Sequence, residues 1–418
     1  MLIHQKGDVM KKAILLILLL LCPSVLGTYN IIEQWDTTLF TGTASSRASG
    51  VAVDSSDNVA VAGRHYNGVD LDWVVVKYDS SGSQLWNHTI AGSSSEDAED
   101  VVVDGGDNII AGGQNGSKWL IIKYNSAGTQ VCNTTFASRT VFGIDKDSSN
   151  NIIAAGTTTT GTSESPTVAK FDSSCNYLWN ATYPAIGIFD LDAFQDVAVD
   201  SLNNVVAAGN INGGKNLLVV KYDSSGNYQW NRTIPTGTYG YTRWPGYGVD
   251  TDSSNNVIVT GTLNDTAWPP TTHTAVFIIK YDSNGNQLWN KTINATTYLA
   301  ATENKAGSYD VAVDSSNEIL IGGFVYANSY PSRWYLKFNS AGTYMWNKYV
   351  DVVANSTSFD VASLNTTAFA STGIYFSWIT EEYDQTEEAA PAPEFSTITL
   401  LMAALIGAGI IFAVRKHK

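Results

Sequence analysis

The stretch Gly50-Val-Ala-Val-Asp-Ser-Ser-Asp-Asn-Val-Ala-Val-Ala-Gly63 is the first half of a unit that recurs along this 418-residue chain. After a gap of variable length, the unit continues with Trp73-Val-Val-Val-Lys-Tyr-Asp-Ser-Ser-Gly-Ser-Gln-Leu-Trp-Asn87. A fixed period of about 50 residues is typical of a chain built from small structural repeats arranged as an array or a ring.

The first and last copies of this unit are each incomplete. The aspartate that closes the first apolar run stands at Asp54, Asp104, Asp147, Asp200, Asp252 and Asp314, with a degraded copy at Asp360. The tryptophan that closes the unit stands at Trp35, Trp86, Trp179, Trp230, Trp289 and Trp346, with Cys132 in the remaining copy. Trp35 precedes every start, and the last start runs through Trp378 without reaching an end. The first and last copies are therefore complementary.

Each copy contains four short β-rich runs, which in the first copy are 50–54, 58–63, 73–79 and 84–90. The Asp-Ser-Ser connections predict tight hairpin turns. Continuous apolar runs such as Leu217–Val220 suit strands that are buried on both faces by neighbouring sheets. We therefore predict an all-β chain, a seven-bladed β-propeller in which an N-terminal strand closes the last blade, followed by one C-terminal transmembrane helix.

The repeated Asp-Val-Ala-Val-Asp-Ser-Ser-x-Asn and Trp-Val-Val-Val-Lys-Tyr-Asp-Ser-Ser-Gly segments resemble the SBBP repeat family of bacterial and archaeal β-propellers. The resemblance covers about residues 30–384, or nearly all of the expected mature chain. It implies the propeller fold and a surface or secreted protein, and it says little about the ligand.

Both ends of the chain carry export signals. A basic segment with an apolar run predicts a signal peptide over residues 1–27. The propeller is expected over 28–384, followed by an acidic, proline-containing linker over 385–396. An apolar stretch predicts a transmembrane helix over 397–414, and a basic cytoplasmic tail follows at 415–418. The propeller is thus expected outside the cell, anchored to the cytoplasmic membrane.

The motif Pro393-Glu394-Phe395, together with the apolar span and the basic tail, resembles the PEF-CTERM sorting signal of archaea. That resemblance implies processing by an archaeosortase-like enzyme and transfer of the protein to a lipid. The alternative is a plain single-pass anchor.

The formal net charge of -15 argues against a nucleic-acid partner.

Two further features suit an exported protein. Of ten Asn-x-Ser/Thr sequons, five directly follow the closing tryptophan slot, at Asn87, Asn133, Asn180, Asn231 and Asn290. These are candidate glycosylation sites on the free outer edge of each blade, where a glycan would hinder pairing between molecules. The alternative is that the residues recur only because the repeat was copied.

Cys132 and Cys175, in neighbouring blades, are a possible disulfide, the alternative being two unrelated thiols.

The variable connections all lie on one face of a propeller, where binding residues are usually found. The longest ones, in blades 5 and 6, are rich in aromatic residues, including Tyr309. As candidate binding residues for a glycan or a partner protein we single out Tyr239, Tyr241, Trp244, Trp268, Tyr298 and Tyr330. The alternative is that these rings pack the loops onto the disc.

Other recurring charges indicate structure. A lysine marks the end of the third strand, and we expect its stem to be buried and its amine to be paired with a nearby acid. These lysines are Lys77, Lys123, Lys170, Lys221, Lys280 and Lys337. The Asp-Ser-Ser turns lack the ligand spacing of calcium loops, so neither a metal nor a cofactor is expected.

No catalytic motif of a sialidase, a quinone-dependent dehydrogenase or a serine hydrolase is visible. Carboxylates converging on the central axis, such as Asp100, Asp196 and Asp310, leave open an enzyme that acts on polysaccharides. The main hypothesis is a non-enzymatic cell-surface scaffold for binding or adhesion, without a catalytic residue. A passive component of the cell-envelope coat is the second alternative.

Overall fold

The computed structural model describes residues 28–41, 46–92, 94–160, 162–184, 192–213, 216–234, 247–264, 274–298, 305–327, 330–350, 357–363, 368–374 and 377–388. The chain divides into two compact units. One comprises Met1–Ile32 with Gln385–Lys418, and the other, Glu33–Asp384, contains the repeats. The fold described below is that of the second unit.

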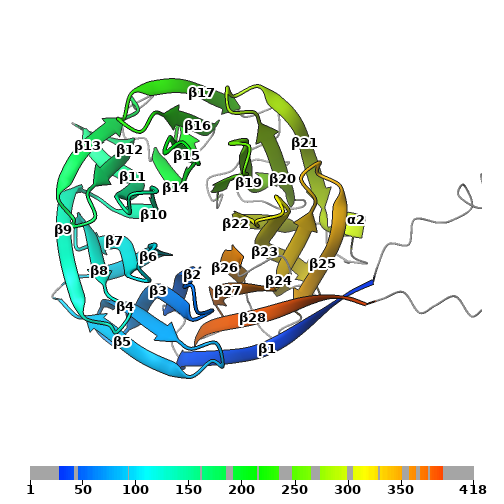
Figure 1. Cartoon of the computed structure of the whole chain (residues 1–418), viewed down its shortest axis with the longest axis horizontal. Helices are drawn as coiled ribbons and strands as arrows, with labels where there is room; N and C mark the ends of the chain where they lie inside the picture. The colour runs from blue at the N-terminus through cyan, green and yellow to red at the C-terminus, as the bar shows by residue number, and fades with distance from the viewer. Residues whose placement is uncertain are drawn as a thin grey trace, which may run out of the picture. The chain divides into compact units, whose positions relative to one another are not determined.

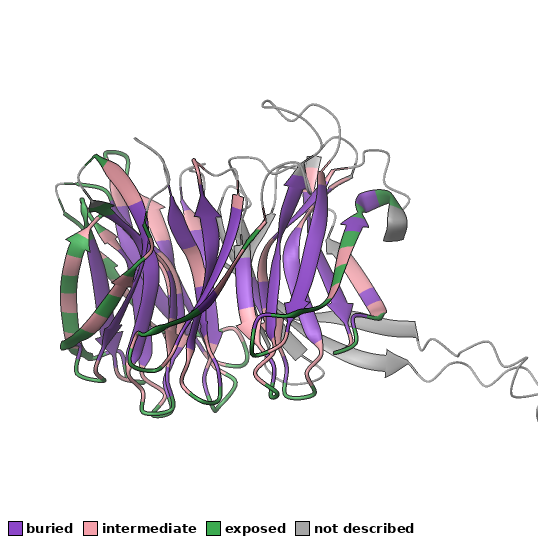
Figure 2. Cartoon of the chain, turned by 90° about the horizontal axis from the view of Figure 1, so that it is seen from above, coloured by how far each residue is buried: buried purple, intermediate pink, exposed green. Residues whose placement is uncertain are grey.

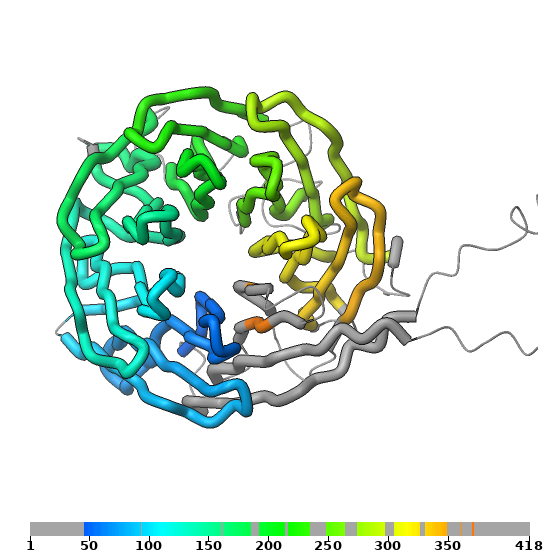
Figure 3. Tube along the Cα trace, viewed as in Figure 1, coloured from blue at the N-terminus to red at the C-terminus, as the bar shows by residue number. Residues whose placement is uncertain are grey.

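The repeats form a β-propeller, in which successive four-stranded sheets surround a common axis (Figure 1). Figure 3 follows the chain as it passes from one sheet to the next around the ring. Blade 1 contains β2 (Arg47–Val53), β3 (Val59–Tyr66), β4 (Leu71–Tyr78) and β5 (Gln84–Ile90). Blade 2 contains β6 (Glu96–Val103), β7 (Ile109–Asn115), β8 (Lys118–Tyr124) and β9 (Gln130–Ser138). Blade 3 contains β10 (Val141–Lys146), β11 (Ile152–Thr160), β12 (Ser163–Phe171) and β13 (Tyr177–Thr182).

The next three blades repeat this arrangement. Blade 4 contains β14 (Ala193–Val199), β15 (Val205–Ile211), β16 (Asn216–Tyr222) and β17 (Tyr228–Ile234). Blade 5 contains β18 (Tyr247–Thr251), β19 (Val257–Asn264), β20 (Thr274–Tyr281) and β21 (Gln287–Asn294), which is followed by the short helix α2 (Ala295–Tyr298). Blade 6 contains β22 (Ala306–Val313), β23 (Ile319–Ala327), β24 (Tyr330–Phe338) and β25 (Tyr344–Val350).

The blade count needs a correction. Six blades, rather than the seven predicted, are built from consecutive strands. The remaining sheet is composite, with the order β1-β28-β27-β26, and it combines β1 (Thr28–Thr41) with β26 (Thr357–Ser363), β27 (Ala368–Ile374) and β28 (Ser377–Glu388). The physical reason is that the last copy of the repeat stops before its outer strand. An N-terminal strand therefore lies beside β28, and β28 itself runs to Glu388, into the segment predicted as linker.

No transmembrane helix is seen in the described ranges. None of their helices is both long and apolar enough to cross a bilayer, and α2 has only four residues. The predicted membrane segment 397–414, the signal peptide 1–27 and the sorting motif at Pro393, Glu394 and Phe395 lie outside the described residues.

Burial follows the strand order within each blade. The two middle strands are buried on both faces, as their continuous apolar runs predict; every residue of β15, for example, is buried. Outer strands such as β5 alternate between exposed and half-buried residues (Figure 2). Each hydrophobic cluster is shared by two neighbouring blades, and Trp73 of blade 1 packs with Leu120 of blade 2. The core of this fold therefore lies between blades.

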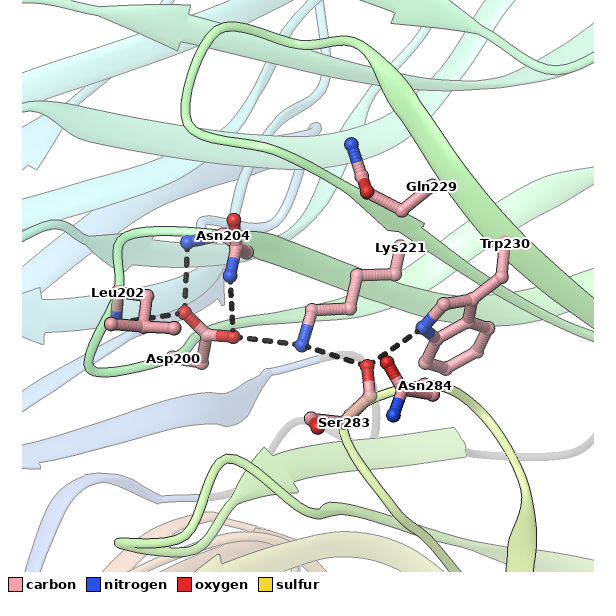
Figure 4. A pocket seen from close by; sticks show the side chains of 8 residues that line it. All are labelled: Asp200, Leu202, Asn204, Lys221, Gln229, Trp230, Ser283 and Asn284. Atoms are coloured by element: carbon pink, nitrogen blue, oxygen red, sulfur yellow. Dashed lines mark hydrogen bonds and ion pairs between the residues drawn. The ribbon is translucent and has the colours of Figure 1, made fainter.

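A buried ion pair recurs in every blade of consecutive strands. In blade 4 the Lys221 amine lies 2.8 Å from Asp200 Oδ2, with both side chains almost fully buried. The amine also lies 3.5 Å from the carbonyl oxygen of Ser283 in blade 5, to which Trp230 Nε1 donates a hydrogen bond of 3.0 Å (Figure 4). The other pairs are Lys77–Asp54, Lys123–Asp104, Lys170–Asp147, Lys280–Asp252 and Lys337–Asp314, at 2.6–3.0 Å. The predicted pairing of these lysines is confirmed.

The same aspartate organises the turn between the first two strands. Asp200 Oδ1 accepts hydrogen bonds from the backbone N–H groups of Leu202 and Asn204. Asn203 has a φ of 63°, a conformation that asparagine tolerates better than most residues. Its side-chain oxygen accepts a 2.9 Å hydrogen bond from Ser148 N in the corresponding turn of blade 3. Neighbouring turns are thus connected around this face of the ring.

A disulfide replaces one of the contacts between outer strands. At the junction of blades 1 and 2, the Trp86 ring lies so close to Gly128 that a Cβ there would be 2.9 Å from the ring. At the next junction Cys132 occupies the tryptophan position and Cys175, with φ 65°, occupies the glycine position. The two sulfur atoms are bonded at 2.07 Å, with the Cα atoms 6.0 Å apart.

Replacing Lys221 with methionine should test the ion pair. Lys221→Met leaves the carboxylate of Asp200 buried without its cation, which should lower the free energy of unfolding by about 3–5 kcal/mol in urea titrations. The exposed Lys118→Met is the matched control and should change it by less than about 0.5 kcal/mol. Adding Asp200→Asn to Lys221→Met should recover part of the loss, because it removes the unpaired buried charge. A double variant that is no more stable than Lys221→Met would show that the unpaired carboxylate is not what lowers the stability.

The disulfide can be tested by rebuilding the contact that it replaces. Cys132→Ser should lower the free energy of unfolding by about 2–4 kcal/mol under oxidising conditions, because the cross-link restricts the unfolded chain. The pair Cys132→Trp and Cys175→Gly should regain much of that stability and should not respond to a reductant. A rebuilt protein that is less stable than Cys132→Ser would show that the two junctions are not equivalent.

Candidate functional site

The innermost strand of five of the six blades carries an irregularity that sequence patterns did not reveal, and β18 of blade 5 pairs without it. In β2, β6, β10, β14 and β22 the register with the next strand slips by one residue. The extra residues are Ser49, Glu99, Phe142, Gln195 and Tyr309. A β-bulge re-aims a side chain and often lies beside a functional site. These positions are near the strand starts, on the face that carries the variable connections.

Charged residues from two blades meet at this level. Arg47 of β2 and Arg64 of β3 are direct cross-strand partners, an arrangement that is unfavourable for like charges. Asp97 and Glu99 of blade 2 provide the compensating charge: Arg47 forms an ion pair with Glu99, and Arg64 forms one with Asp97. Arg47 also lies 3.6 Å from Asp97 Oδ2.

Tyr309 of blade 6 is the bulge residue of β22, and its ring centroid lies 5.6 Å from that of Phe324 in the same blade. Tyr309 and Arg47 also influence each other's pKa electrostatically, although the composite sheet separates blades 6 and 1 in the ring. Arg47, Arg64, Asp97, Glu99 and Tyr309 are called the Arg47 cluster below.

Protonation in the Arg47 cluster is shifted by burial. Asp97 is only 1% exposed, and burial followed by repulsion from Glu99 raises its pKa to about 7. The nearby guanidinium groups oppose this shift. Burial also raises the pKa of Tyr309 to about 12, so its hydroxyl keeps its proton near neutral pH and can donate a hydrogen bond. The cluster thus presents cationic, anionic and hydroxyl groups together.

A second set of acids lies on the inner strands. Asp100 accepts hydrogen bonds of 2.7 Å from Val101 N and from Ile144 N of the next blade. Asp196 does the same with Val197 N and Val249 N. The other members are Asp145, Asp250 and Asp310, each of which accepts a hydrogen bond from an inner-strand N–H of the following sheet. We call these five the axial aspartates.

The contacts of the axial aspartates favour a structural role. Both oxygens of Asp100 and Asp196 accept backbone N–H groups, which connects inner edges that would otherwise lack partners. The backbones approach so closely that a Cβ on Gly50 would lie 2.6 Å from the Cα of Asp100. Asp100, Asp196 and Asp310 do interact electrostatically, so the predicted convergence is present.

Burial, followed by mutual repulsion, raises the pKa of Asp100 and Asp196 well above the ordinary value. Burial also raises the pKa of Asp145 to about 6 and that of Asp250 to about 7. The lysine-paired acids behave in the opposite way. Burial alone would raise their pKa, but hydrogen bonds from the lysine, the turn asparagine and the backbone lower it in Asp54, Asp104, Asp147 and Asp252.

These shifts predict how stability depends on pH. Between the unfolded pKa of about 3.9 and the folded values near 6–7, the folded protein binds more protons at the axial aspartates, so stability falls as pH rises. The lysine-paired acids lose stability as pH falls below about 4. The free energy of unfolding should therefore peak near pH 4 and decrease toward pH 8, by up to about 1.4 kcal/mol for each unit by which folding raises the pKa of an axial aspartate.

The control for this prediction is Asp145→Asn with Asp250→Asn. Asparagine cannot accept both N–H groups, so the variant should be less stable at pH 5. It should, however, lose less stability than the natural protein between pH 5 and pH 8 in urea titrations. If the free energy of unfolding fell equally between pH 5 and pH 8 in both proteins, Asp145 and Asp250 would not be the source of this pH dependence.

The binding residues predicted from the sequence lie outside what the structure describes. Tyr239, Tyr241, Trp244 and Trp268 lie outside the described residues, and so do the side chains of Tyr298 and Tyr330. The glycosylation candidates are described: Asn87, Asn133, Asn180 and Asn290 are exposed, whereas Asn231 is half-buried. Within the described ranges, no three His, Cys, Asp or Glu side chains are arranged to hold a metal ion.

A pocket of about 380 Å³ lies on the turn face, between blades 4 and 5 (Figure 4). It is lined by Asp200, Lys221, Trp230 and Ser283, which are the members of the blade 4 ion pair and its hydrogen-bonded neighbours. Because the same residues recur at other junctions, this pocket is explained by the repeat.

Comparison with known proteins supports the fold alone. No family model matches the sequence, and no curated protein sequence matches it. A catalytically inactive virginiamycin B lyase from Staphylococcus aureus, solved with quinupristin, is similar in structure, with a TM-score of 0.51, 9% identity, and coverage of 85% of this chain and 99% of the other. The Dos1 propeller gives a TM-score of 0.51 at 11% identity, covering 85% and 95%.

Proposed function

We propose that this protein is an exported, non-enzymatic β-propeller scaffold that binds a polar ligand, of the glycan class or on a partner protein, on the face carrying the variable connections. The observation that carries this proposal is the group of charged side chains that Arg47, Asp97 and Glu99 form between blades 1 and 2, with Tyr309 of blade 6 near enough to Arg47 to influence its pKa. Guanidinium, carboxylate and phenol groups can together donate and accept the hydrogen bonds that a sugar requires.

Asp97 gives this proposal further support. Its Oδ1 atom is buried and has no hydrogen-bond partner among the described residues. An unsatisfied buried acceptor costs about 1–3 kcal/mol, so a hydroxyl donor from a ligand would be favoured there. The aromatic residues of the longest connections, including Trp244 and Trp268, lie outside the described residues, and we propose them as further ligand contacts from the sequence alone.

Export and anchoring are also part of the proposal. A disulfide between Cys132 and Cys175 suits an oxidising compartment. The resemblance to SBBP repeats and to the PEF-CTERM signal supports a cell-surface location, membrane or lipid anchoring, and processing by an archaeosortase-like enzyme. The seven-bladed description rests on counting the composite sheet as a blade.

Binding should be measured with the mature natural protein on a glycan array and against surface proteins of its own cells. Glu99→Gln and Tyr309→Phe should each weaken binding about tenfold or more, because the first removes a negative charge and the second a hydroxyl group from the Arg47 cluster. Melting temperatures should change by only a few degrees. Leu202→Ala, an exposed position on the opposite face, is the control and should bind normally.

Two other outcomes would replace this proposal. Retention of no glycan or protein would favour a passive coat component. Turnover of a polysaccharide would favour an enzyme, and the axial aspartates would then be the first residues to substitute.

A further inference from the structure

The outer strands present their sequons in a regular way. Residues two apart in a strand share a face, so the asparagine and the threonine of an Asn-x-Thr sequence point to the same side. In β5, Asn87 and Thr89 are both exposed, while His88 between them is half-buried. The same holds for the pairs Asn133 and Thr135, Asn180 and Thr182, and Asn290 and Thr292.

An exposed apolar residue accompanies each of these four pairs. It lies two residues before the asparagine and therefore on the same outward face. The residues and their exposed fractions are Leu85 (51%), Val131 (54%), Leu178 (48%) and Leu288 (52%). All four stand on β5, β9, β13 or β21, the end strands of their sheets. An exposed apolar edge strand invites pairing with another molecule, and proteins usually protect such edges.

The outer strands of blades 4 and 6 break the pattern in both respects. In blade 4 the asparagine of the sequon, Asn231, is half-buried and donates a 2.9 Å hydrogen bond to Tyr183 Oη. The residue two before it is the polar Gln229. In blade 6 Asn347 is followed by Lys-Tyr and forms no sequon, and Met345 is half-buried. Exposed apolar residues at this position therefore occur where an exposed sequon occurs.

We propose that Asn87, Asn133, Asn180 and Asn290 carry N-linked glycans that cover the exposed apolar residue on the same strand, and that Asn231 remains unmodified. This inference rests on the exported location in the proposed function and not on its ligand. A sugar attached two residues from Leu85 would lie over the same outward face.

The modification needs a sugar donor of a stated class, a polyprenyl phosphate-linked or diphosphate-linked oligosaccharide. The asparagine Nδ2 forms a bond with C1 of the first sugar, the bond from C1 to the phosphate oxygen breaks, and the lipid phosphate leaves. Nδ2 gives up one proton, and no oxidant or reductant is required. In β13 the Tyr177 hydroxyl donates to Asn180 Oδ1, which leaves Nδ2 for this reaction. In β17, Asn231 Nδ2 already donates to Tyr183.

Glycopeptide mass spectrometry of the natural full-length protein tests the inference. Peptides containing Asn87, Asn133, Asn180 and Asn290 should carry sugar, and those containing Asn231 or Asn347 should be bare. The same spectra report removal of the signal peptide and the state of Cys132 and Cys175. Bare asparagines at all four positions in a processed, oxidised protein would overturn the glycan inference alone. A reduced protein that retains its signal peptide would overturn the export proposal.

Variants test whether the glycans cover the apolar residues. Replacing the four asparagines with glutamine should increase self-association at least several-fold in light scattering, whereas Asn231→Gln should not. Adding Leu85→Lys, Val131→Lys, Leu178→Lys and Leu288→Lys to the four glutamine substitutions should restore a monodisperse protein without sugar. Continued association of this combined variant, with unchanged circular dichroism, would overturn the covering role, and so would equal occupancy at Asn231.

Discussion

The buried pair of lysine and aspartate is the interaction on which the ring depends. One carboxylate, such as that of Asp200, shapes the turn of its own blade with one oxygen and holds Lys221 with the other. The amine and Trp230 then meet the carbonyl oxygen of Ser283 in the following blade. The aspartate thus shapes the turn, and through the lysine it connects the interior of one blade with the next blade. Because these contacts depend on a few positions, those positions recur while the rest of the repeat varies.

Much of this architecture was predictable because the repeat encodes contacts that are local to one copy. Continuous apolar runs indicated strands buried on both faces, and the placement of Lys77 indicated an acid partner, which proved to be Asp54. The incomplete first and last copies predicted that a strand from the N-terminal end would lie beside the last strands, and the sheet order agrees. The six blades of consecutive strands follow from the complete copies.

The Arg47 cluster was missed for a physical reason. A β-bulge adds one residue to a strand whose apolar pattern continues, so Glu99 and Tyr309 read as ordinary members of strand starts. The ion pair of Arg47 with Glu99 depends on the packing of two neighbouring blades, and the electrostatic influence of Tyr309 on Arg47 depends on closure of the ring. The carboxylates of Asp100 and Asp196 were recognised as convergent, but their backbone partners belong to other copies.

The close approach of Gly50 to Asp100 divides the six blades into pairs. A Cβ at Gly143 would collide with Asp196 and one at Gly248 with Asp310 in the same way, so a blade with glycine at this position precedes a blade with aspartate three times in succession. Within each pair, no residue larger than glycine fits at the first position without moving the inner strand of the second blade. The composite sheet, in which Asp360 follows Asp310 at this position, lies outside this alternation.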